Sequence, residues 1–308
     1  MEVVVGLHNL KPRHVGCVLT IGSFDGVHLG HRMLLDQLVE KGRDLDAPSM
    51  LLTFEPTPRE YFRGGVVPAR LTRFREKISL LEKTELDRLL CLPFNERTAK
   101  TPAGWVVDEL LANRLGVRHL VVGDDFRFGR GAEGDFDMLV EGGRRHGFEV
   151  SRMKTFTLRG ARVSSTRVRE ALWQGDFELA ETLLGHPYFM MGRVVYGRQL
   201  GRQLGVPTAN IRLQRYRTPL EGVFAVTVNG LDRVYEGVAN VGVRPTVDGK
   251  EPLLEVHIFD FTREIYGKLL TVEFKHKIRD ERAFDGLDAL KAQIDRDIAH
   301  TREFFADA

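Results

Sequence analysis

Residues 22–31 read Gly-Ser-Phe-Asp-Gly-Val-His-Leu-Gly-His and decide the fold of the first half of the chain. The apolar run Val18–Ile21 precedes them and a helical pattern from Met33 follows, which predicts a strand, a glycine-rich turn and the first turn of a helix. Such a turn binds phosphate in α/β proteins, because glycines let backbone N–H groups approach an anion and the helix N-terminus attracts it. We expect His28 and His31, three residues apart, to face the same pocket.

Other phosphate and metal motifs fit this stretch less well. Its glycines stand at 22, 26 and 30, which is not the dinucleotide spacing G-x-G-x-x-G, and it lacks the Lys-Ser/Thr ending of a P-loop. A zinc site would need further ligands, and none lie nearby in the sequence. On spacing alone, a helix-capping turn with two solvated histidines stays open.

The stretch resembles the H-x-G-H signature of the nucleotidyltransferase superfamily. The longer pattern G-x-F-D-G-V-H-x-G-H is similar to the one in bacterial bifunctional riboflavin kinase/FAD synthetases. This resemblance implies that His28 and His31 are catalytic in adenylyl transfer. It also implies a set of nucleotide-binding residues in the same stretch, namely Gly22, Phe24, Asp25 and Gly30.

Length and composition indicate two globular domains without a strongly charged partner. The chain has 308 residues, about two domains at roughly 150 residues each, and 43% of them are hydrophobic. Its 45 basic and 43 acidic residues give a net charge of +2, which argues against nucleic-acid binding as the main function and leaves small anions as ligands.

Cysteine content and hydropathy point to a cytoplasmic protein. Cys17 and Cys91 each lie in an apolar run and form neither a C-x-x-C motif nor a disulfide framework, so we expect reduced thiols in the core. The N-terminus has no signal-peptide pattern, and no apolar run approaches the roughly 18 residues of a membrane span.

The first half of the chain alternates short apolar strands with helical periods, which predicts a doubly wound α/β domain. The expected strands are 18–21, 50–54, 89–92, 119–122 and 149–153. Ligands of such folds collect at the carboxyl ends of the strands. We place the domain boundary at 186/187, so that residues 1–186 form the first domain and 187–308 the second.

Polar segments follow three of the expected strands, at 55–59, 123–130 and 163–169. Taken singly, these could be ordinary turns and a helix N-cap. Together they resemble further motifs of FAD synthetase domains, the last being similar to I-S-S-T-x-I-R, with Val163 and Val168 in place of isoleucine. The resemblance implies triphosphate binding by Ser164, Ser165, Thr166 and Arg167. It implies flavin binding by Asp125, Phe126, Arg127 and Phe128.

The second half changes to glycine-punctuated β segments, which predict a small barrel. The expected strands include 222–228, 235–241, 253–259 and 269–274. Beyond them an apolar helix face is expected to pack against the barrel, formed by Leu287, Leu290, Ile294, Ile298 and Phe305.

Residues 192–211 hold the chemistry of this half. Glycines at 197, 201 and 205 with arginines at 198 and 202 predict a flexible cationic loop for polyphosphate. Thr208 and Asn210 offer a hydroxyl and an amide oxygen on the same side of an extended chain, which suits Mg²⁺, although on spacing alone a turn is the commoner outcome.

This stretch resembles the riboflavin kinase signature G-R-x-L-G-F-P-T-A-N-I, with Val206 at the phenylalanine. The resemblance implies nucleotide binding by Gly197, Gly201 and Arg202 and magnesium binding by Thr208 and Asn210. On the later strand it assigns the catalytic base to Glu255, which the alternating pattern alone would leave as a solvent-facing residue. It further implies flavin contacts by Arg279 and Arg282.

The sequence therefore predicts a bifunctional enzyme that phosphorylates riboflavin to FMN with MgATP and adenylylates FMN to FAD with release of pyrophosphate. Two alternatives stay open. Another H-x-G-H adenylyltransferase would not explain the Pro207–Asn210 segment, and a non-catalytic flavin-binding regulator should have lost residues such as His28 or Glu255. No nucleic acid or membrane is expected as a partner, and self-association has no support in the sequence.

Overall fold

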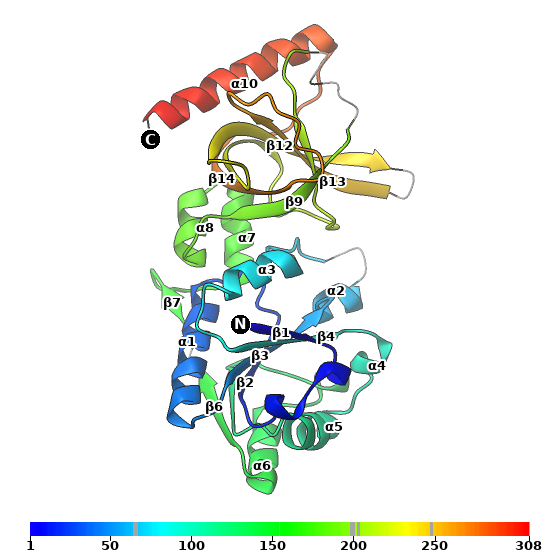
Figure 1. The fold of residues 1–308 in the computed structure, drawn as a ribbon, viewed down its shortest axis with the longest axis vertical. Helices are drawn as coiled ribbons and strands as arrows, with labels where there is room; N and C mark the ends of the chain where they lie inside the picture. The colour runs from blue at the N-terminus through cyan, green and yellow to red at the C-terminus, as the bar shows by residue number, and fades with distance from the viewer. Residues whose placement is uncertain (64–66, 154, 198–200, 202–203, 247–248, 308) are drawn as a thin grey trace. The chain divides into compact units, whose positions relative to one another are not determined.

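The chain forms two compact units (Figure 1). The computed structural model describes residues 1–63, 67–153, 155–197, 201, 204–246 and 249–307. The first unit comprises Met1–Val67 and Lys77–Val163, and the second comprises Pro68–Glu76 and Ser164–Ala308. The second unit thus includes a segment from early in the sequence. The domain boundary at 186/187 stays a prediction.

The first unit is built on a parallel sheet with the strand order β1-β4-β3-β2-β5-β6. Its strands are β1 (Glu2–Val5), β2 (Val18–Ile21), β3 (Ser49–Glu55), β4 (Arg88–Pro93), β5 (His119–Gly123) and β6 (Glu149–Met153). All the strands expected in this half are present, whereas β1 and a small hairpin were not predicted. The hairpin strands are β7 (Thr157–Leu158) and β8 (Ala161–Arg162).

Helical segments connect these strands. They are η1 (Leu7–Asn9), η2 (Pro12–His14), α1 (Leu29–Asp44), α2 (Pro58–Arg63), α3 (Phe74–Leu81), α4 (Glu96–Ala99), α5 (Ala103–Trp105), η3 (Val106–Arg114), η4 (Arg130–Ala132) and α6 (Phe136–His146). The division between the two units falls inside α3. Parallel strands joined by helical crossovers confirm the predicted doubly wound α/β fold.

The strand order reverses at β2, which pairs with β3 on one side and β5 on the other. In doubly wound folds the chain segments that leave such a pair of strands diverge to opposite sides of the sheet, and ligands bind between them at the carboxyl ends of the strands. Residues 22–31 follow β2 and residues 124–130 follow β5. Both predicted motifs thus begin at the place where doubly wound folds bind ligands.

Both cysteines lie in the first unit and are buried without a disulfide, as predicted. Cys17 packs with Leu19, Leu52 and Leu120 in the apolar core beneath the sheet. This burial disfavours the thiolate and raises the pKa of the Cys17 thiol to about 12. The thiol therefore acts as a small apolar side chain.

The second unit contains a closed antiparallel barrel with the strand order β10-β13-β12-β11-β14-β9. Its strands are β9 (Phe189–Val195), β10 (Ala209–Arg212), β11 (Gly222–Asn229), β12 (Tyr235–Thr246), β13 (Gly249–Ile258) and β14 (Leu269–Arg279). Its helices are α7 (Ser165–Gln174), α8 (Phe177–Leu184) and α10 (Leu287–Asp307). Phe177 of α8 packs against Phe224 and Phe274 of the barrel, with ring centroids 5.8 and 6.5 Å away. The predicted barrel and C-terminal helix are confirmed.

A buried ion pair fixes the early segment Pro68–Glu76 within the second unit. Arg215 donates from Nη2 to both carboxylate oxygens of Glu76, at 2.7 and 2.8 Å, and the two side chains are only 2% and 1% exposed. The carboxylate also accepts the backbone N–H groups of Arg73 and Met191, at 2.6 and 2.8 Å. Four charge-assisted hydrogen bonds therefore compensate for the desolvation of this pair.

The inward face of α10 combines the predicted apolar side chains, most of them half-buried, with fully buried polar side chains that were not predicted. Ile298 does pack with an apolar cluster that includes Val223 and Phe259 of the barrel, but Leu287 is 55% exposed. The side chains of α10 that are buried recur every four residues and are Gln293, Asp297 and Thr301. Hydrogen bonds pair these groups, so their burial carries little desolvation penalty.

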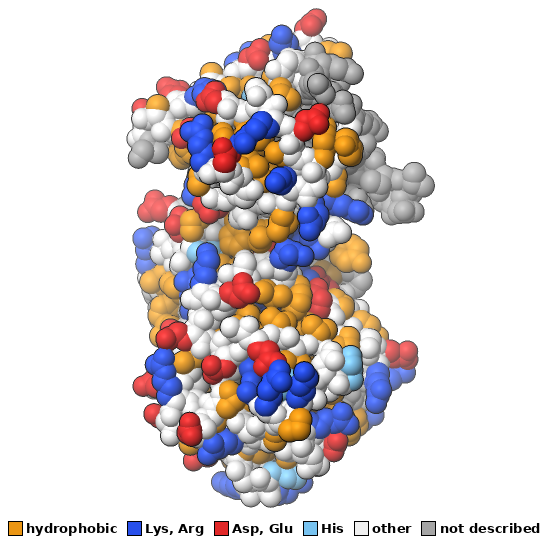
Figure 2. Space-filling model, viewed as in Figure 1, with side chains coloured by type: hydrophobic (Ala, Val, Ile, Leu, Met, Phe, Trp, Pro, Cys, Tyr) orange, Lys and Arg blue, Asp and Glu red, His pale blue; other side chains and the backbone are white. Residues whose placement is uncertain are grey.

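None of the helices in the described ranges is long and apolar enough to cross a membrane. On the face shown in Figure 2, basic and acidic side chains are interspersed. This pattern agrees with the nearly balanced charge of the sequence.

Candidate functional site

The two histidines of residues 22–31 lie ring against ring at the N-terminus of α1. The rings of His28 and His31 are stacked with centroids 3.6 Å apart and an interplanar angle of 12°. His28 is the N-cap of α1, because its Nδ1 accepts the backbone N–H of His31 at 3.3 Å. When neutral, the His28 ring therefore carries its proton on Nε2 and donates from that atom. The structure brings the two imidazoles together where the helix dipole favours an anion.

The glycines of this turn make room for the aromatic rings. A Cβ at Gly22 would lie 2.9 Å from Cε2 of Phe24, and one at Gly30 would lie 3.3 Å from the His28 ring. Phe24 has a left-handed backbone with φ 48°, which costs energy for a residue with a side chain. Its ring stacks on His31 with centroids 4.5 Å apart. Phe24, His31 and His28 thus form one continuous stack.

His31 is held as a neutral imidazole. Burial of its ring, followed by the fields of His28 and Lys77, places the pKa of His31 well below its usual value of 6.5. Its Nδ1 is buried and makes no hydrogen bond within the part of the chain that the structure describes. A buried polar atom without a partner is costly, and a bound polar ligand would remove that cost.

The loop after β5 combines carboxylates with aromatic rings. Phe126 and Phe128 stack with centroids 5.8 Å apart and pack against the core of the first unit. Asp125 forms an exposed ion pair with Arg162 at 3.3 Å, and Arg127 lies 3.6 Å from Asp135. The two phenylalanines are therefore anchored, whereas Asp125 and Arg127 are held by weak surface pairs that a ligand can replace.

An aromatic cluster that the sequence interpretation missed follows the neighbouring strands β3 and β4. Phe54, Tyr61, Phe62 and Phe94 meet edge to face, with centroid separations between 5.3 and 5.6 Å. Tyr61 and Phe62 are 39% and 63% exposed. We call these four residues the aromatic cluster. These residues come from β3, from α2 and from the position directly after β4, so no local sequence motif could reveal the cluster.

Ser164 caps α7 in the second unit. Its Oγ accepts the backbone N–H of Arg167 at 3.3 Å, which is the N-cap arrangement that the sequence left open. Ser165, Thr166 and Arg167 form the first turn of this helix. Their predicted role in triphosphate binding stays a prediction.

Strand register in the barrel aligns three polar residues. Glu255 of β13 pairs with Asn210 of β10 on one side and with Asn240 of β12 on the other. Directly paired residues project from the same face of a sheet, with Cβ atoms about 5 Å apart. The predicted base Glu255 and the predicted metal ligand Asn210 are therefore neighbours.

Gly197 and Gly201 approach residues of this part of the barrel closely. A Cβ at Gly197 would lie 2.4 Å from Nδ2 of Asn210, and one at Gly201 would lie 2.4 Å from the carbonyl oxygen of Val206 and 3.3 Å from Oγ1 of Thr208. Only glycine allows the backbone to approach Thr208 and Asn210 this closely. Arg202, predicted to bind nucleotide, lies outside the described residues.

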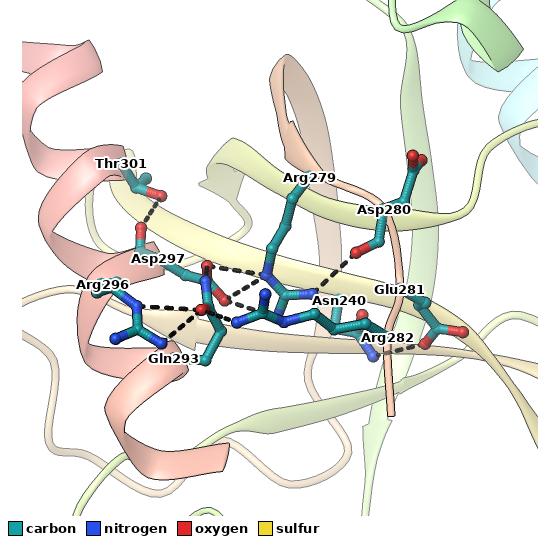
Figure 3. Close-up of polar contacts among 9 residues, drawn as sticks. All are labelled: Asn240, Arg279, Asp280, Glu281, Arg282, Gln293, Arg296, Asp297 and Thr301. Atoms are coloured by element: carbon teal, nitrogen blue, oxygen red, sulfur yellow. Dashed lines mark hydrogen bonds and ion pairs between the residues drawn. The ribbon is translucent and has the colours of Figure 1, made fainter. Parts of the chain in front are cut away.

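Arg279 and Arg282, predicted to contact flavin, belong to a polar network against α10 (Figure 3). Arg279 binds Asp297 through Nε and Nη2, at 2.8–3.0 Å. Arg282 donates to Oε1 of Gln293, whose Nε2 donates to Asp297 at 2.7 Å. Arg279 therefore holds α10 on the barrel, and the structure gives Arg282 a partner at the start of the same helix.

Residues of the barrel offer oxygen atoms that could bind a hard cation together with phosphate oxygens of a substrate. No group of three or more histidine, cysteine, aspartate or glutamate side chains with metal-binding geometry occurs among the described residues. Asn210 and Glu255 instead supply an amide and a carboxylate oxygen from directly paired strand positions, and Thr208, two residues before Asn210, adds a hydroxyl. Mg²⁺ takes oxygen ligands and completes its shell with waters and substrate phosphates, so these residues fit the predicted ion.

Two family models match separate parts of the chain. The model described as FAD synthetase matches residues 10–167, and the model described as riboflavin kinase matches residues 184–305. Curated relatives match the full length. A bifunctional riboflavin kinase/FMN adenylyltransferase of Pseudomonas fluorescens is 50% identical, with 99% of this chain and 98% of the relative covered. Proteins of the same name from Escherichia coli (strain K12) and Haemophilus influenzae are 49% and 47% identical, with 99% of this chain and 98% and 99% of the relatives covered.

A solved structure shares the fold over its whole length. It is titled a macrolide-efflux protein from Streptococcus pneumoniae, and it matches with a TM-score of 0.81 and 28% identity. The match covers 98% of this chain and 99% of that one.

Proposed function

The chain belongs to the family of bifunctional riboflavin kinase/FMN adenylyltransferases, and from this premise we propose where each of its two reactions takes place. The protein phosphorylates riboflavin to FMN and adenylylates FMN to FAD, with ATP as the donor in both reactions. Residues 1–186 carry adenylyl transfer and residues 187–308 carry the kinase. This division rests on the two matched ranges and on the separate clusters of polar residues described above.

In adenylyl transfer, a phosphate oxygen of FMN attacks the α-phosphorus of ATP and pyrophosphate leaves. No protein nucleophile is needed, so the protein contributes alignment and charge stabilisation. His28 donates from Nε2 to an α-phosphate oxygen at the N-terminus of α1, and neutral His31 donates from its one ring N–H. Gly22, Phe24, Asp25 and Gly30 shape this turn. Ser164, Ser165, Thr166 and Arg167 stay the predicted ligands of the β- and γ-phosphates.

The flavin of FMN binds over exposed aromatic rings at the carboxyl ends of the sheet strands. The aromatic cluster supplies the exposed rings of Tyr61 and Phe62, and the loop after β5 adds the partly buried rings of Phe126 and Phe128. Flat rings favour offset or edge contacts with other rings, worth about 1 kcal/mol each beyond their buried area. Asp125 and Arg127 supply polar contacts at the rim.

In the kinase reaction, the carboxylate of Glu255 accepts the proton of the terminal ribityl hydroxyl, and the oxygen of that hydroxyl attacks the γ-phosphorus of ATP. The bond from the γ-phosphorus to the bridging oxygen breaks, and ADP leaves. Asn240 and Asn210 flank Glu255 in register and orient the reacting groups. Gly197, Gly201 and Arg202 cover the phosphates, and Arg282 lies in the segment predicted to contact flavin.

Thr208 and Asn210 would hold Mg²⁺, which would neutralise charge on the ATP phosphates. EDTA should therefore abolish FMN formation, and added MgCl₂ should restore it. Asn210→Ala should raise the Mg²⁺ concentration needed for half-maximal FMN formation by about tenfold. An unchanged requirement would remove Asn210 from the metal site.

The stacked pair of His28 and His31, with the buried Nδ1 atom of His31, is the observation that supports the adenylylation site most strongly. His28→Ala should abolish FAD formation from FMN and ATP but leave FMN formation from riboflavin close to wild type. Chromatography of the flavins separates the two products. Loss of both activities in a folded variant would contradict separate sites.

The protein acts on riboflavin, FMN and ATP, and we place it in the cytoplasm because Cys17 and Cys91 are buried and form no disulfide. Its nearly balanced charge gives no reason to add nucleic acid to these partners.

A further inference from the structure

Lys77 is a buried lysine next to the adenylylation site. It lies in α3, and its side chain is fully buried. Its Nζ donates to the carbonyl oxygen of Ser23 at 2.5 Å and to Oγ1 of Thr53 at 3.3 Å. Lysines are almost never buried without compensation, because desolvation of an ammonium group costs several kcal/mol. The burial of the Lys77 ammonium group at this cost in free energy indicates that the group has a specific role.

The carbonyl that Lys77 binds controls the backbone that carries the aromatic stack. Thr53 Oγ1 lies 3.5 Å from the same oxygen, so strand, helix and turn meet at Ser23. The carbonyl of Ser23 belongs to the planar peptide group that leads into Phe24, so a fixed carbonyl oxygen also fixes the direction of the N–H and N–Cα bonds of Phe24. Phe24 keeps the unfavourable φ of 48° there, and its ring stacks on His31.

The charge of Lys77 also acts on the site directly. Burial of the His31 ring, followed by the fields of His28 and Lys77, lowers the pKa of His31. A positive charge at this turn also lowers the energy of anionic phosphates at the N-terminus of α1.

We propose that Lys77 is a positioning residue for adenylyl transfer, which fixes the Ser23–Phe24 peptide and thereby the His28–His31 stack, and whose charge favours bound phosphate. This inference rests on the proposed role of the two histidines. Lys77 acts through Ser23 and Phe24 and does not itself contact the reacting atoms.

The test replaces Lys77 by methionine and measures both activities. Lys77→Met should lower kcat for FAD formation by about tenfold or more, because small displacements of aligned groups reduce the rate strongly. FMN formation by the same molecules should stay at the wild-type rate, which verifies that the second unit is folded. Lys83→Met is the matched control, since Lys83 is exposed just beyond α3. It should leave both activities unchanged.

The pH profile distinguishes this role from a purely structural one. Removal of a neighbouring positive charge raises the pKa of His31, so the loss of FAD formation on acidification should begin at higher pH in Lys77→Met than in wild type. Lys77→Arg retains the charge and should keep the wild-type profile even where its kcat is lower. A structural role alone would lower the thermal stability of Lys77→Met and leave the profile in place.

If Lys77→Met does not fold, Thr53→Val replaces it, because this change removes one hydrogen-bond partner of the ammonium group and keeps the charge. It should lower kcat for FAD formation severalfold and leave the pH profile unchanged. Two results would overturn the inference about Lys77: a wild-type kcat for FAD formation in Thr53→Val, or a wild-type kcat and pH profile in Lys77→Met.

The His28→Ala variant tests the proposed function separately. If His28→Ala forms no FAD, the proposed function stands even where the inference about Lys77 fails. If His28→Ala still forms FAD, the proposed function itself is refuted.

Discussion

Replacement of Arg215 by alanine should destabilise the second unit strongly. The substitution removes two hydrogen bonds to the Glu76 carboxylate, at 2.7 and 2.8 Å, and leaves that carboxylate in a site where it is 1% exposed. The backbone N–H groups of Arg73 and Met191 still bind it, but the cation is lost. Breaking a buried ion pair on one side costs about 3–5 kcal/mol. For a unit of this size that corresponds to a fall in Tm of roughly 10 °C.

The assay is thermal inactivation of FMN formation, with calorimetry on the same samples. Replacing both partners, as Arg215→Met with Glu76→Leu, should recover most of the lost stability, because no buried charge is then left without its partner. Lys100→Ala is the control, since it breaks an exposed pair with Glu96 and should not shift Tm measurably. An Arg215→Ala protein with a Tm within 1 °C of wild type would refute the reasoning.

Two further predictions follow from the site and the sheet. Burial lowers the pKa of His119 in the folded state below 6.5. The contribution of neutral His119 to the free energy of unfolding is therefore complete above the pKa of the unfolded state, and it is lost as the pH falls through the lowered pKa of the folded state. Tm should therefore fall less between pH 7.5 and 5.5 in His119→Gln than in wild type, and an equal fall would contradict the assignment. Gly197→Ala should lower FMN formation by roughly tenfold or more, since its Cβ would lie 2.4 Å from Nδ2 of Asn210, while FAD formation from added FMN stays unchanged. Gly104→Ala, where a Cβ meets nothing within 4 Å, should leave both rates unchanged, and equal effects of the two substitutions would count against close approach at Gly197.

The central strands could be predicted from the sequence because strands buried on both faces read as continuous apolar runs. β1 could not, since it is a short strand at the edge of the sheet, in which Val3 and Val5 are 37% and 51% exposed. β9 was missed because Gly192 and Arg193 interrupt its pattern. The glycine is needed there, since a Cβ would lie 2.7 Å from the carbonyl oxygen of Arg212.

The buried polar side chains of α10 were not predicted, for a different reason. Apolar periodicity depends only on the residue types along the helix. It does not show that Asp297 forms an ion pair with Arg279, which is 18 positions away in the sequence. The stacked histidines were predictable because both lie within one local motif. The aromatic cluster and Lys77 were not, because their partners come from separate segments that only the folded chain brings together.

The ion pair of Glu76 and Arg215 has a consequence for folding during synthesis. The two residues are separated by 139 positions. A ribosome that adds about 5–20 residues per second makes Arg215 roughly 7–28 s after Glu76. During that interval the segment Pro68–Glu76 must stay hydrated, because its carboxylate cannot be buried before its cation exists. The nascent chain therefore completes this part of its structure only after the start of the barrel has emerged, and a break in translation between the two residues would expose an unfinished segment.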